Sequence, residues 1–207
     1  MTKKINTIIF DYGGVICTTR RSQQLANWIN EKYGIAKEDV ISQFDVGVWD
    51  DYNIGKSSAE ECYQAFQDLG VPLSTDELKK KFSSFGHPDP RMKELVLNLK
   101  KQGYDLAMLS DSVPELTEVV RENFPDTFRV EVFSEEVRMR KPNPAIYDLT
   151  LERIGNPAEK CLFIDDKEKN LVYPQEIGIN VHLFRSVDEL VDDLKMYNIN
   201  KLSRRIN

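Results

Sequence analysis

The sequence predicts an α/β fold, a Rossmann-like doubly wound parallel sheet of about five core strands with an all-helical subdomain inserted after the first strand. Short apolar runs that end in small or acidic residues alternate with longer segments of helical period, which is typical of βαβ units. Between the first two runs, roughly 75 residues carry helical period alone, far more than a crossover connection needs. The chain is therefore expected to divide into a core domain and an inserted cap.

Five short apolar runs are the expected strands, at residues 6–10, 105–109, 130–133, 161–164 and 179–183. Apolar residues then recur at helical spacing, which predicts amphipathic crossover helices over residues 114–123, 144–153, 167–177 and 188–196. Two of these helices are expected to stop at glycines, Gly155 and Gly178. A parallel sheet requires crossovers of this kind between its strands.

The inserted subdomain is expected to span residues 17–87. Its predicted helices cover residues 23–33, 37–44, 59–69 and 75–82, and Ser58 and Ser74 are placed as N-caps. Pro88 and Pro90 mark the return to the core, where residues 91–102 are expected to form the helix that leads into the second strand. The core domain is accordingly assigned to residues 1–16 and 88–207.

The composition indicates a globular chain that works in the cytoplasm. Of its 207 residues, 41% are hydrophobic and 30% charged, and the net charge of −6 argues against nucleic acid or an anionic membrane as a partner. No apolar run is long enough to span a membrane, and the N-terminus lacks the pattern of a secretory signal. Three scattered cysteines form neither a metal-binding pattern nor a complete disulfide framework, which fits a reducing compartment.

A carboxylate and two glycines follow the first predicted strand, at the sheet edge where a doubly wound fold builds its site. The segment reads Asp11-Tyr12-Gly13-Gly14, and the glycines let backbone amides approach an anion closely. Asp11 is a candidate nucleophile or metal ligand. Taken alone, it is explained comparably well as an Asp that caps its own turn.

The next two strand ends supply a hydroxyl and a cation. Ser110 and Asp111 precede a helix start, where a hydroxyl and backbone amides suit a phosphoryl oxygen, although alone the segment is better explained as a helix cap. Lys141 lies in a basic segment, residues 138–144, whose prolines fix the loop geometry. Its ammonium group can neutralise a phosphate, and a solvated basic loop is the alternative interpretation.

Two adjacent carboxylates, Asp165 and Asp166, follow the fourth predicted strand and form the strongest single signal. Adjacent carboxylates repel each other, and a hard cation held between them and another acid relieves that repulsion. The alternative, in which one Asp caps the next helix and the other is solvated, explains one carboxylate but not the pair. With Asp11, Ser110 and Lys141 on the same edge, the pattern predicts Mg²⁺-assisted phosphoryl transfer through an aspartyl-phosphate.

These four motifs, in this order and spacing, resemble those of the haloacid dehalogenase superfamily, specifically its phosphatases with a helical cap after the first strand. The resemblance covers nearly the whole chain and lies in residues 10–15, 109–111, 140–142 and 163–166. The segments 51–61 and 139–142 are also similar to bacterial α-D-glucose-1-phosphate phosphatases. The resemblance implies a Mg²⁺-dependent hydrolase of a small phosphorylated metabolite, with a sugar phosphate favoured.

The resemblance also implies a role for each motif residue. Asp11 would attack phosphorus while Ser110 and Lys141 hold the phosphoryl oxygens. The oxyanion cradle would be completed by the backbone amides of Tyr12, Gly13 and Asp111. Mg²⁺ would bridge Asp11, the Gly13 carbonyl and Asp166. Asp165 would act on the metal indirectly or through water, with Asn170 orienting the acidic pair.

Gly13 departs from the pattern of most phosphatases in the superfamily. The resemblance places a second Asp there, which protonates the leaving group and then activates water. Such acid–base catalysis typically contributes about 10²- to 10⁴-fold, so its loss favours leaving groups that need little proton assistance. A sugar 1-phosphate meets that condition, and the similar glucose-1-phosphate phosphatases also have glycine here. Gly13 counts against a phosphoglucomutase, which needs proton transfer at both ends of its substrate.

Two other functions remain open at this point. A 2-haloacid dehalogenase uses the same Asp without a metal, but the Asp165-Asp166 pair would repel its carboxylate substrate if no cation were present. A catalytically weak or inactive regulator that binds a phosphate ligand or a protein partner is kept open by Gly13.

Several residues near the cap could contribute to a pocket. Of the aromatic residues Trp28, Phe44 and Trp49, Trp49 is the better pocket candidate and Trp28 is expected in the cap core. Arg20 and Arg21 follow the first motif at the cap entrance, where they could steer a phosphate or form a solvated hinge.

Overall fold

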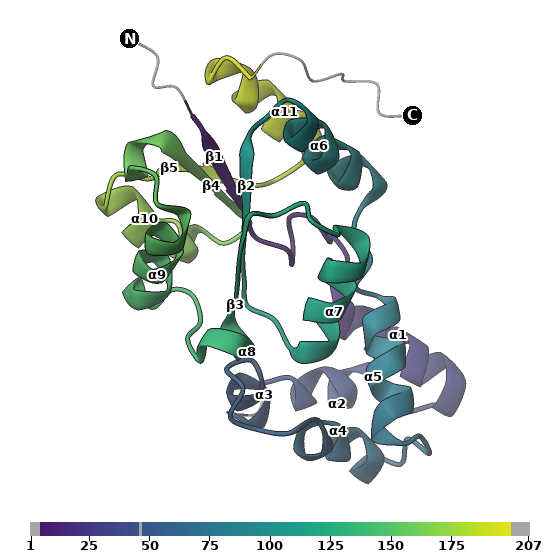
Figure 1. The fold of residues 1–207 in the computed structure, drawn as a ribbon. Coiled ribbons are helices and arrows are strands. Elements are labelled where there is room, and N and C mark those ends of the chain that lie inside the picture. The colour runs from purple at the N-terminus through teal and green to yellow at the C-terminus, as the bar shows by residue number, and fades with distance from the viewer. Residues whose placement is uncertain (1–4, 46, 200–207) are drawn as a thin grey trace.

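A five-stranded parallel sheet forms the centre of the protein (Figure 1). The computed structural model describes residues 5–45 and 47–199. Its strand order is β3-β2-β1-β4-β5, with every neighbouring pair parallel. The strands are β1 (Thr7–Phe10), β2 (Asp105–Ser110), β3 (Val130–Phe133), β4 (Cys161–Asp165) and β5 (Asn180–Leu183). The predicted doubly wound α/β class is confirmed.

Helices cover both faces of the sheet, and the side chains of β1 show the division. Ile8 and Phe10 pack into the cluster that holds one set of helices, whereas Ile9 packs into the cluster on the opposite face. The first set is α6 (Pro90–Lys101), α7 (Pro114–Asn123) and α11 (Val187–Met196), and α9 (Pro144–Ile154) covers the other face. Because β1 is buried on both faces, its last three residues, Ile8, Ile9 and Phe10, are all apolar.

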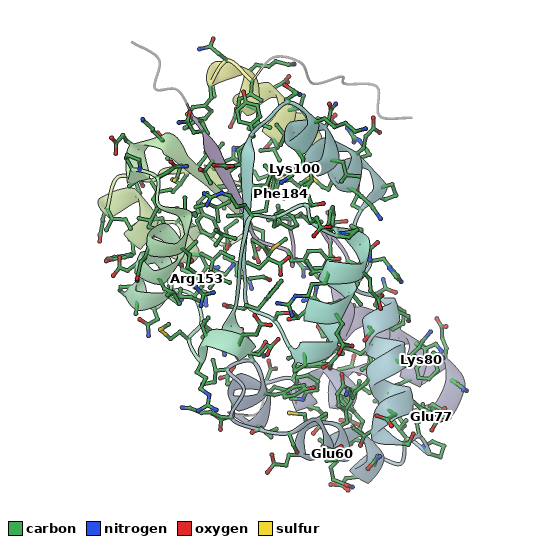
Figure 2. The ribbon with its side chains drawn as sticks, in the orientation of Figure 1. Glu60, Glu77, Lys80, Lys100, Arg153 and Phe184 are labelled. Atoms are coloured by element: carbon green, nitrogen blue, oxygen red, sulfur yellow. The ribbon has the colours of Figure 1, made fainter. Side chains whose placement is uncertain are left out.

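Five helices lie between β1 and α6, and the described part of this interval contains no strand. They are α1 (Arg21–Tyr33), α2 (Lys37–Gln43), α3 (Gly47–Tyr52), α4 (Ala59–Asp68) and α5 (Thr75–Ser84). Ser58 and Ser74 begin α4 and α5 with complete capping boxes, as the sequence predicts. The five helices enclose an aromatic core of their own, and charged side chains such as Glu60, Glu77 and Lys80 lie on the outside (Figure 2).

A buried carboxylate connects the five helices to the core. Glu115 on α7 accepts a hydrogen bond from the hydroxyl of Tyr52 at 2.6 Å and another from the hydroxyl of Tyr63. Burial and the Glu115 charge raise the pKa of both tyrosines, so they remain donors. Nearby, the Ser134 hydroxyl donates to the Asn53 carbonyl at 2.5 Å. The helical insertion is thus fixed to the core by buried polar contacts from α3 and α4.

Glu115→Ala is expected to lower the free energy of unfolding by about 3 kcal/mol, because two buried tyrosine hydroxyls lose a charged acceptor. Urea denaturation followed by circular dichroism measures the change. Glu118→Ala is the matched control, since Glu118 lies on the same helix and is exposed. Equal stability of the two variants would show that the buried contact does not hold the insertion.

The single helix predicted over residues 167–177 is wrong. The structure has a 3-10 turn, η2 (Glu168–Asn170), followed by the short helix α10 (Val172–Glu176). Asp165 explains the break, because its carboxylate accepts from the Lys167 amide and from the Asn170 side chain and holds the chain in a tight turn. Two further helices, α3 and α8 (Ser134–Val137), were not predicted, since six and four residues are too few to show a helical period.

The longest helix of the described chain is α1, with 13 residues. Of the helices in residues 5–45 and 47–199, none is both long enough and apolar enough to cross a lipid bilayer. The expectation about a secretory signal falls partly on residues 1–4, which are outside the described residues.

Candidate active site

The carboxyl ends of three neighbouring strands bring the predicted site residues to one edge of the sheet. Phe10 pairs in register with Met108 on β2 and with Ile164 on β4, so the residues after them meet at one level. Asp11 follows β1 directly, Ser110 ends β2 and Asp165 ends β4. All three side chains are buried.

Lys141 lies at the centre of this edge. Its ammonium nitrogen is 3.0 Å from Oδ1 of Asp11 and 2.7 Å from Oδ2 of Asp165, and it donates to the Leu109 carbonyl at 3.2 Å. The backbone amide of Lys141 donates to Oδ1 of Asp111 at 2.9 Å, which fixes the loop that carries it. With its side chain only 1% exposed, Lys141 is a fixed cation shared by two carboxylates.

Burial and charge act in opposite directions on the central pair. Burial raises the pKa of Asp11 to about 6, although the Lys141 ammonium opposes the shift. Burial alone would lower the pKa of Lys141, but the Asp11 and Asp165 carboxylates raise it above its usual value. At neutral pH the site therefore holds a charged lysine beside an ionised Asp11.

Asp165 and Asp166 are adjacent in sequence but differ in their partners. Both oxygens of Asp165 are engaged, by Lys141, by the Lys167 amide at 2.8 Å and by the Asn170 amide group at 3.0 and 3.1 Å. Asp166 has a buried oxygen, Oδ1, without any hydrogen-bond partner, and burial raises the pKa of this carboxyl. Asp166 is thus the member of the pair with an oxygen available to a ligand.

The three carboxylates fit a magnesium ion. One oxygen from each of Asp11, Asp165 and Asp166 lies within 4.8 Å of the others. Oxygen donors of this kind are what Mg²⁺ prefers, and an unpartnered buried carboxylate oxygen beside an ionised one calls for a cation. Gly14 makes room for the arrangement, because its φ is +85° and a Cβ built there would lie 2.3 Å from Oδ2 of Asp166.

A cavity of about 720 Å³ opens above these residues and is lined by both the core and the helical insertion. Asp11, Gly13, Asp111 and Asp166 reach it from the core. Ser110 and Lys141 are buried and do not line it. The cavity volume suits a small-molecule ligand.

The insertion contributes an aromatic wall to the cavity, formed by Phe44, Trp49 and Phe82. The rings of Phe44 and Trp49 are 4.7 Å apart, and the indole nitrogen of Trp49 is buried without a partner. Trp28 does not line the cavity and packs edge-on against Tyr33. Of the two tryptophans, Trp49 therefore lines the pocket and Trp28 packs within the insertion, as the sequence predicts.

The family model of haloacid dehalogenase-like hydrolases matches residues 5–172, most of the chain and all four motifs. The chain belongs to this family. The resemblance noted from the sequence is confirmed, and with it the expectation of a hydrolase.

Relatives cover nearly the whole hydrolase. The sesquiterpene phosphatase astK of Aspergillus oryzae is 27% identical over 194 residues, 90% of this chain and 94% of that protein. The D-ribitol-5-phosphate phosphatase of Bacteroides thetaiotaomicron is 28% identical over 186 residues, 84% and 89% of the two chains. Among solved structures, the magnesium complex of HAD family enzyme bt-2542 from the same bacterium has a TM-score of 0.77 at 25% identity and covers 93% of this chain and 100% of that one.

The structure adds contacts at the site that the sequence analysis did not identify. The amide of Tyr12 donates to the Asp11 carboxylate at 2.6 Å, so this amide already has a partner. Arg140 pairs with Asp50 of α3 across the cavity. Arg185 also lines the cavity, and its position two residues after the fifth strand could have identified it. Strand ends are thus a better guide to this site than residue type alone.

Gly14→Ala is expected to weaken Mg²⁺ binding by about 10- to 100-fold, because its Cβ would displace the Asp166 carboxylate. Isothermal titration with Mg²⁺ measures the affinity. Gly103→Ala is the matched control, since Gly103 has nearly the same φ, +86°, and a Cβ built there would have no other atom within 4 Å. Equal Mg²⁺ affinity in both variants would contradict the assignment of Asp166.

Proposed function

We propose that the hydrolase is a Mg²⁺-dependent phosphatase that removes the phosphoryl group from a small phosphorylated metabolite. The observation that carries this proposal is the meeting of Asp11, Lys141 and Asp166 beneath a cavity of small-molecule size. A nucleophilic carboxylate, a fixed cation and an oxygen-rich metal site are the groups that phosphoryl transfer uses. The phosphatase names of two relatives support the same reaction class.

In the proposed mechanism, Asp11 is the nucleophile. One of its oxygens forms a bond to phosphorus, the bond from phosphorus to the leaving oxygen breaks, and an aspartyl-phosphate results. Lys141 holds Asp11 in place and neutralises a phosphoryl oxygen. Ser110 and the amides of Gly13 and Asp111 bind the other phosphoryl oxygens. Water then attacks phosphorus and restores the carboxylate.

Asp11, Asp166 and the Gly13 carbonyl are the proposed ligands of Mg²⁺, which supplies neutralisation of the phosphoryl charge when bound. Asp165 is not proposed to bind Mg²⁺ directly, since its oxygens already accept hydrogen bonds from Lys141 and Asn170. Asp165 therefore positions Lys141, and Asn170 positions Asp165. We assign the direct metal contact to Asp166 and not to Asp165 because Oδ1 of Asp166 has no hydrogen-bond partner.

We further propose that the helical insertion, residues 17–87, is a cap that selects the substrate, with a sugar phosphate favoured. Its aromatic wall suits the C–H face of a sugar ring, and the free N–H of Trp49 can donate to a hydroxyl. The similarity to a D-ribitol-5-phosphate phosphatase agrees with a polyol or sugar body. We expect the reaction to take place in the cytoplasm.

Phosphate release from a panel of sugar phosphates, nucleotides and simple phosphate esters tests the proposal, with Mg²⁺ or with a chelator. Mg²⁺-dependent release that is greatest with sugar phosphates is expected. A folded, Mg²⁺-binding protein that releases no phosphate would instead be a regulator. Halide release from 2-chloropropionate that is insensitive to chelation would assign a dehalogenase.

A further inference from the structure

Arg21 occupies the space beside Gly13 that a side chain at that position would take. A Cβ built on Gly13 would lie 3.2 Å from Nη2 and 3.5 Å from Nη1 of Arg21. Arg21 is the first residue of α1, so its guanidinium reaches the core from the helical insertion. It lines the same cavity as Asp11 and Gly13.

The guanidinium of Arg21 has an unused donor. Its Nη1 is buried and has no hydrogen-bond partner, which costs free energy unless a ligand accepts from it. By contrast, Arg140 in the same cavity is already paired with Asp50. A buried cationic donor that opens onto a cavity indicates an anionic or partly anionic group on the ligand.

The position of Arg21 indicates which part of a substrate it meets. Lys141 is buried beneath the cavity and lies against Asp11, so the transferred phosphoryl group is held from the core side. The organic part of the substrate must then extend into the cavity, away from Lys141. Because Arg21 lines this cavity beside Gly13, two residues after Asp11, it is placed near the junction between the phosphoryl group and the organic part.

The described carboxyl groups of the cavity are all committed to other partners or to the metal site. Asp50 pairs with Arg140, Asp111 accepts from the Lys141 amide, and Asp11 and Asp166 belong to the acidic cluster. A leaving oxygen on this side therefore meets a permanent cation instead of a proton donor. A guanidinium stabilises developing negative charge through its N–H groups and keeps its protons.

We infer that Arg21 is a catalytic residue that binds the leaving oxygen of the substrate and stabilises its charge; this inference rests on the proposed phosphatase function. When Asp11 attacks, the electron pair of the breaking bond goes to the leaving oxygen, which Arg21 holds as an alkoxide. The alkoxide takes a proton from solvent water as it departs. Water then attacks the phosphorus of the aspartyl-phosphate, which gives inorganic phosphate, restores the Asp11 carboxylate and releases the proton that neutralises the hydroxide left in solvent.

This role predicts a preference among substrates. Alcohols of low acidity leave as highly basic alkoxides and depend most on Arg21, whereas p-nitrophenolate delocalises its own charge and depends on it least. Glucose 1-phosphate and glucose 6-phosphate have the same sugar body but differ in the acidity of the leaving hydroxyl. The wild-type hydrolase is expected to favour the anomeric phosphate.

The test compares Arg21→Gln with the wild type, with Mg²⁺ present, on p-nitrophenyl phosphate, phenyl phosphate and glucose 6-phosphate. We expect kcat/KM to fall by about 10²- to 10³-fold for glucose 6-phosphate and by less than about fivefold for p-nitrophenyl phosphate. Arg21→Lys is expected to recover part of the loss. Arg20→Gln is the matched control, since Arg20 also lines the cavity but is exposed and does not adjoin Gly13 in the way that Arg21 does, and it should change all three rates by one factor.

The outcomes separate this inference from the proposed function. If the wild type releases phosphate from none of the three esters, nor from glucose 1-phosphate and the other members of the phosphate ester panel, the phosphatase proposal itself fails. If the wild type is active but Arg21→Gln slows all three esters equally, or slows none, Arg21 does not act on the leaving oxygen. Thermal unfolding of each variant confirms that the compared proteins are folded.

Discussion

Asp11→Asn is expected to reduce phosphate release by at least about 10⁴-fold, because an amide oxygen cannot act as the nucleophile. The side chain is nearly isosteric and only 4% of Asp11 is exposed, so the fold should be retained. Lys141 would still have Asp165 as a partner at 2.7 Å. Colorimetric phosphate release at saturating Mg²⁺ measures the loss.

Asp50→Asn is the control for this variant. Asp50 is a carboxylate of the same cavity, but it pairs with Arg140 instead of Lys141. Its replacement should leave kcat within about tenfold of the wild-type value, as expected for a residue that makes no bond to the reacting atoms. Comparable activity of Asp11→Asn and the wild type would remove Asp11 from the mechanism.

Lys141→Met is expected to lower the free energy of unfolding at neutral pH by about 3–5 kcal/mol and to abolish phosphate release. The ammonium lies between the buried carboxylates of Asp11 and Asp165, and its loss leaves them facing each other without a cation. The phosphoryl group would also lose its fixed positive charge. Urea denaturation gives the stability and phosphate release gives the activity.

The double variant Lys141→Met with Asp165→Asn separates the two effects. Neutralising Asp165 removes half of the uncompensated negative charge, so the double variant should regain much of the stability but none of the activity. Additive destabilisation would show that Lys141 and Asp165 do not act as a pair. Activity in the double variant would show that the phosphoryl group does not need the ammonium.

The strand ends account for most of what the sequence could predict. Four of the five strands are short apolar runs that end at, or just before, a small or acidic residue, so the fold class and the positions of Asp11, Ser110 and Asp165 follow from one pattern. The Ser58 and Ser74 caps were predictable for a similar reason, because the capping box is local in sequence. Local signals of this kind need no knowledge of the tertiary structure.

The turn after β4 was not predictable in the same way. The spacing of its apolar residues is helical. The Lys167 amide and the Asn170 side chain, however, donate hydrogen bonds to Asp165, and these bonds prevent a continuous helix. The division of labour between Asp165 and Asp166 depends on Lys141, which is distant in sequence and is placed by its own loop. Only tertiary structure reveals which of two adjacent carboxylates is occupied.

The role of Arg21 at the cavity could not be predicted from the sequence either. The sequence places it after the first motif, where a solvated hinge and a phosphate-steering role are equally good interpretations. The structure brings its guanidinium to the side of Gly13 and leaves Nη1 without a partner. The absence of a side chain at Gly13 therefore makes room for the guanidinium of Arg21.

Trapping of the aspartyl-phosphate distinguishes attack by Asp11 on phosphorus from direct attack by water. The hydrolase is mixed with a radiolabelled phosphate ester and Mg²⁺, quenched in acid within the first turnover, digested, and its peptides are analysed by mass spectrometry. A hydroxylamine-sensitive phosphoryl label is expected on the peptide that contains Asp11, and no label is expected in Asp11→Asn. Substrate turnover without any label in the wild type, or with the label on another residue, would show that Asp11 is not the nucleophile.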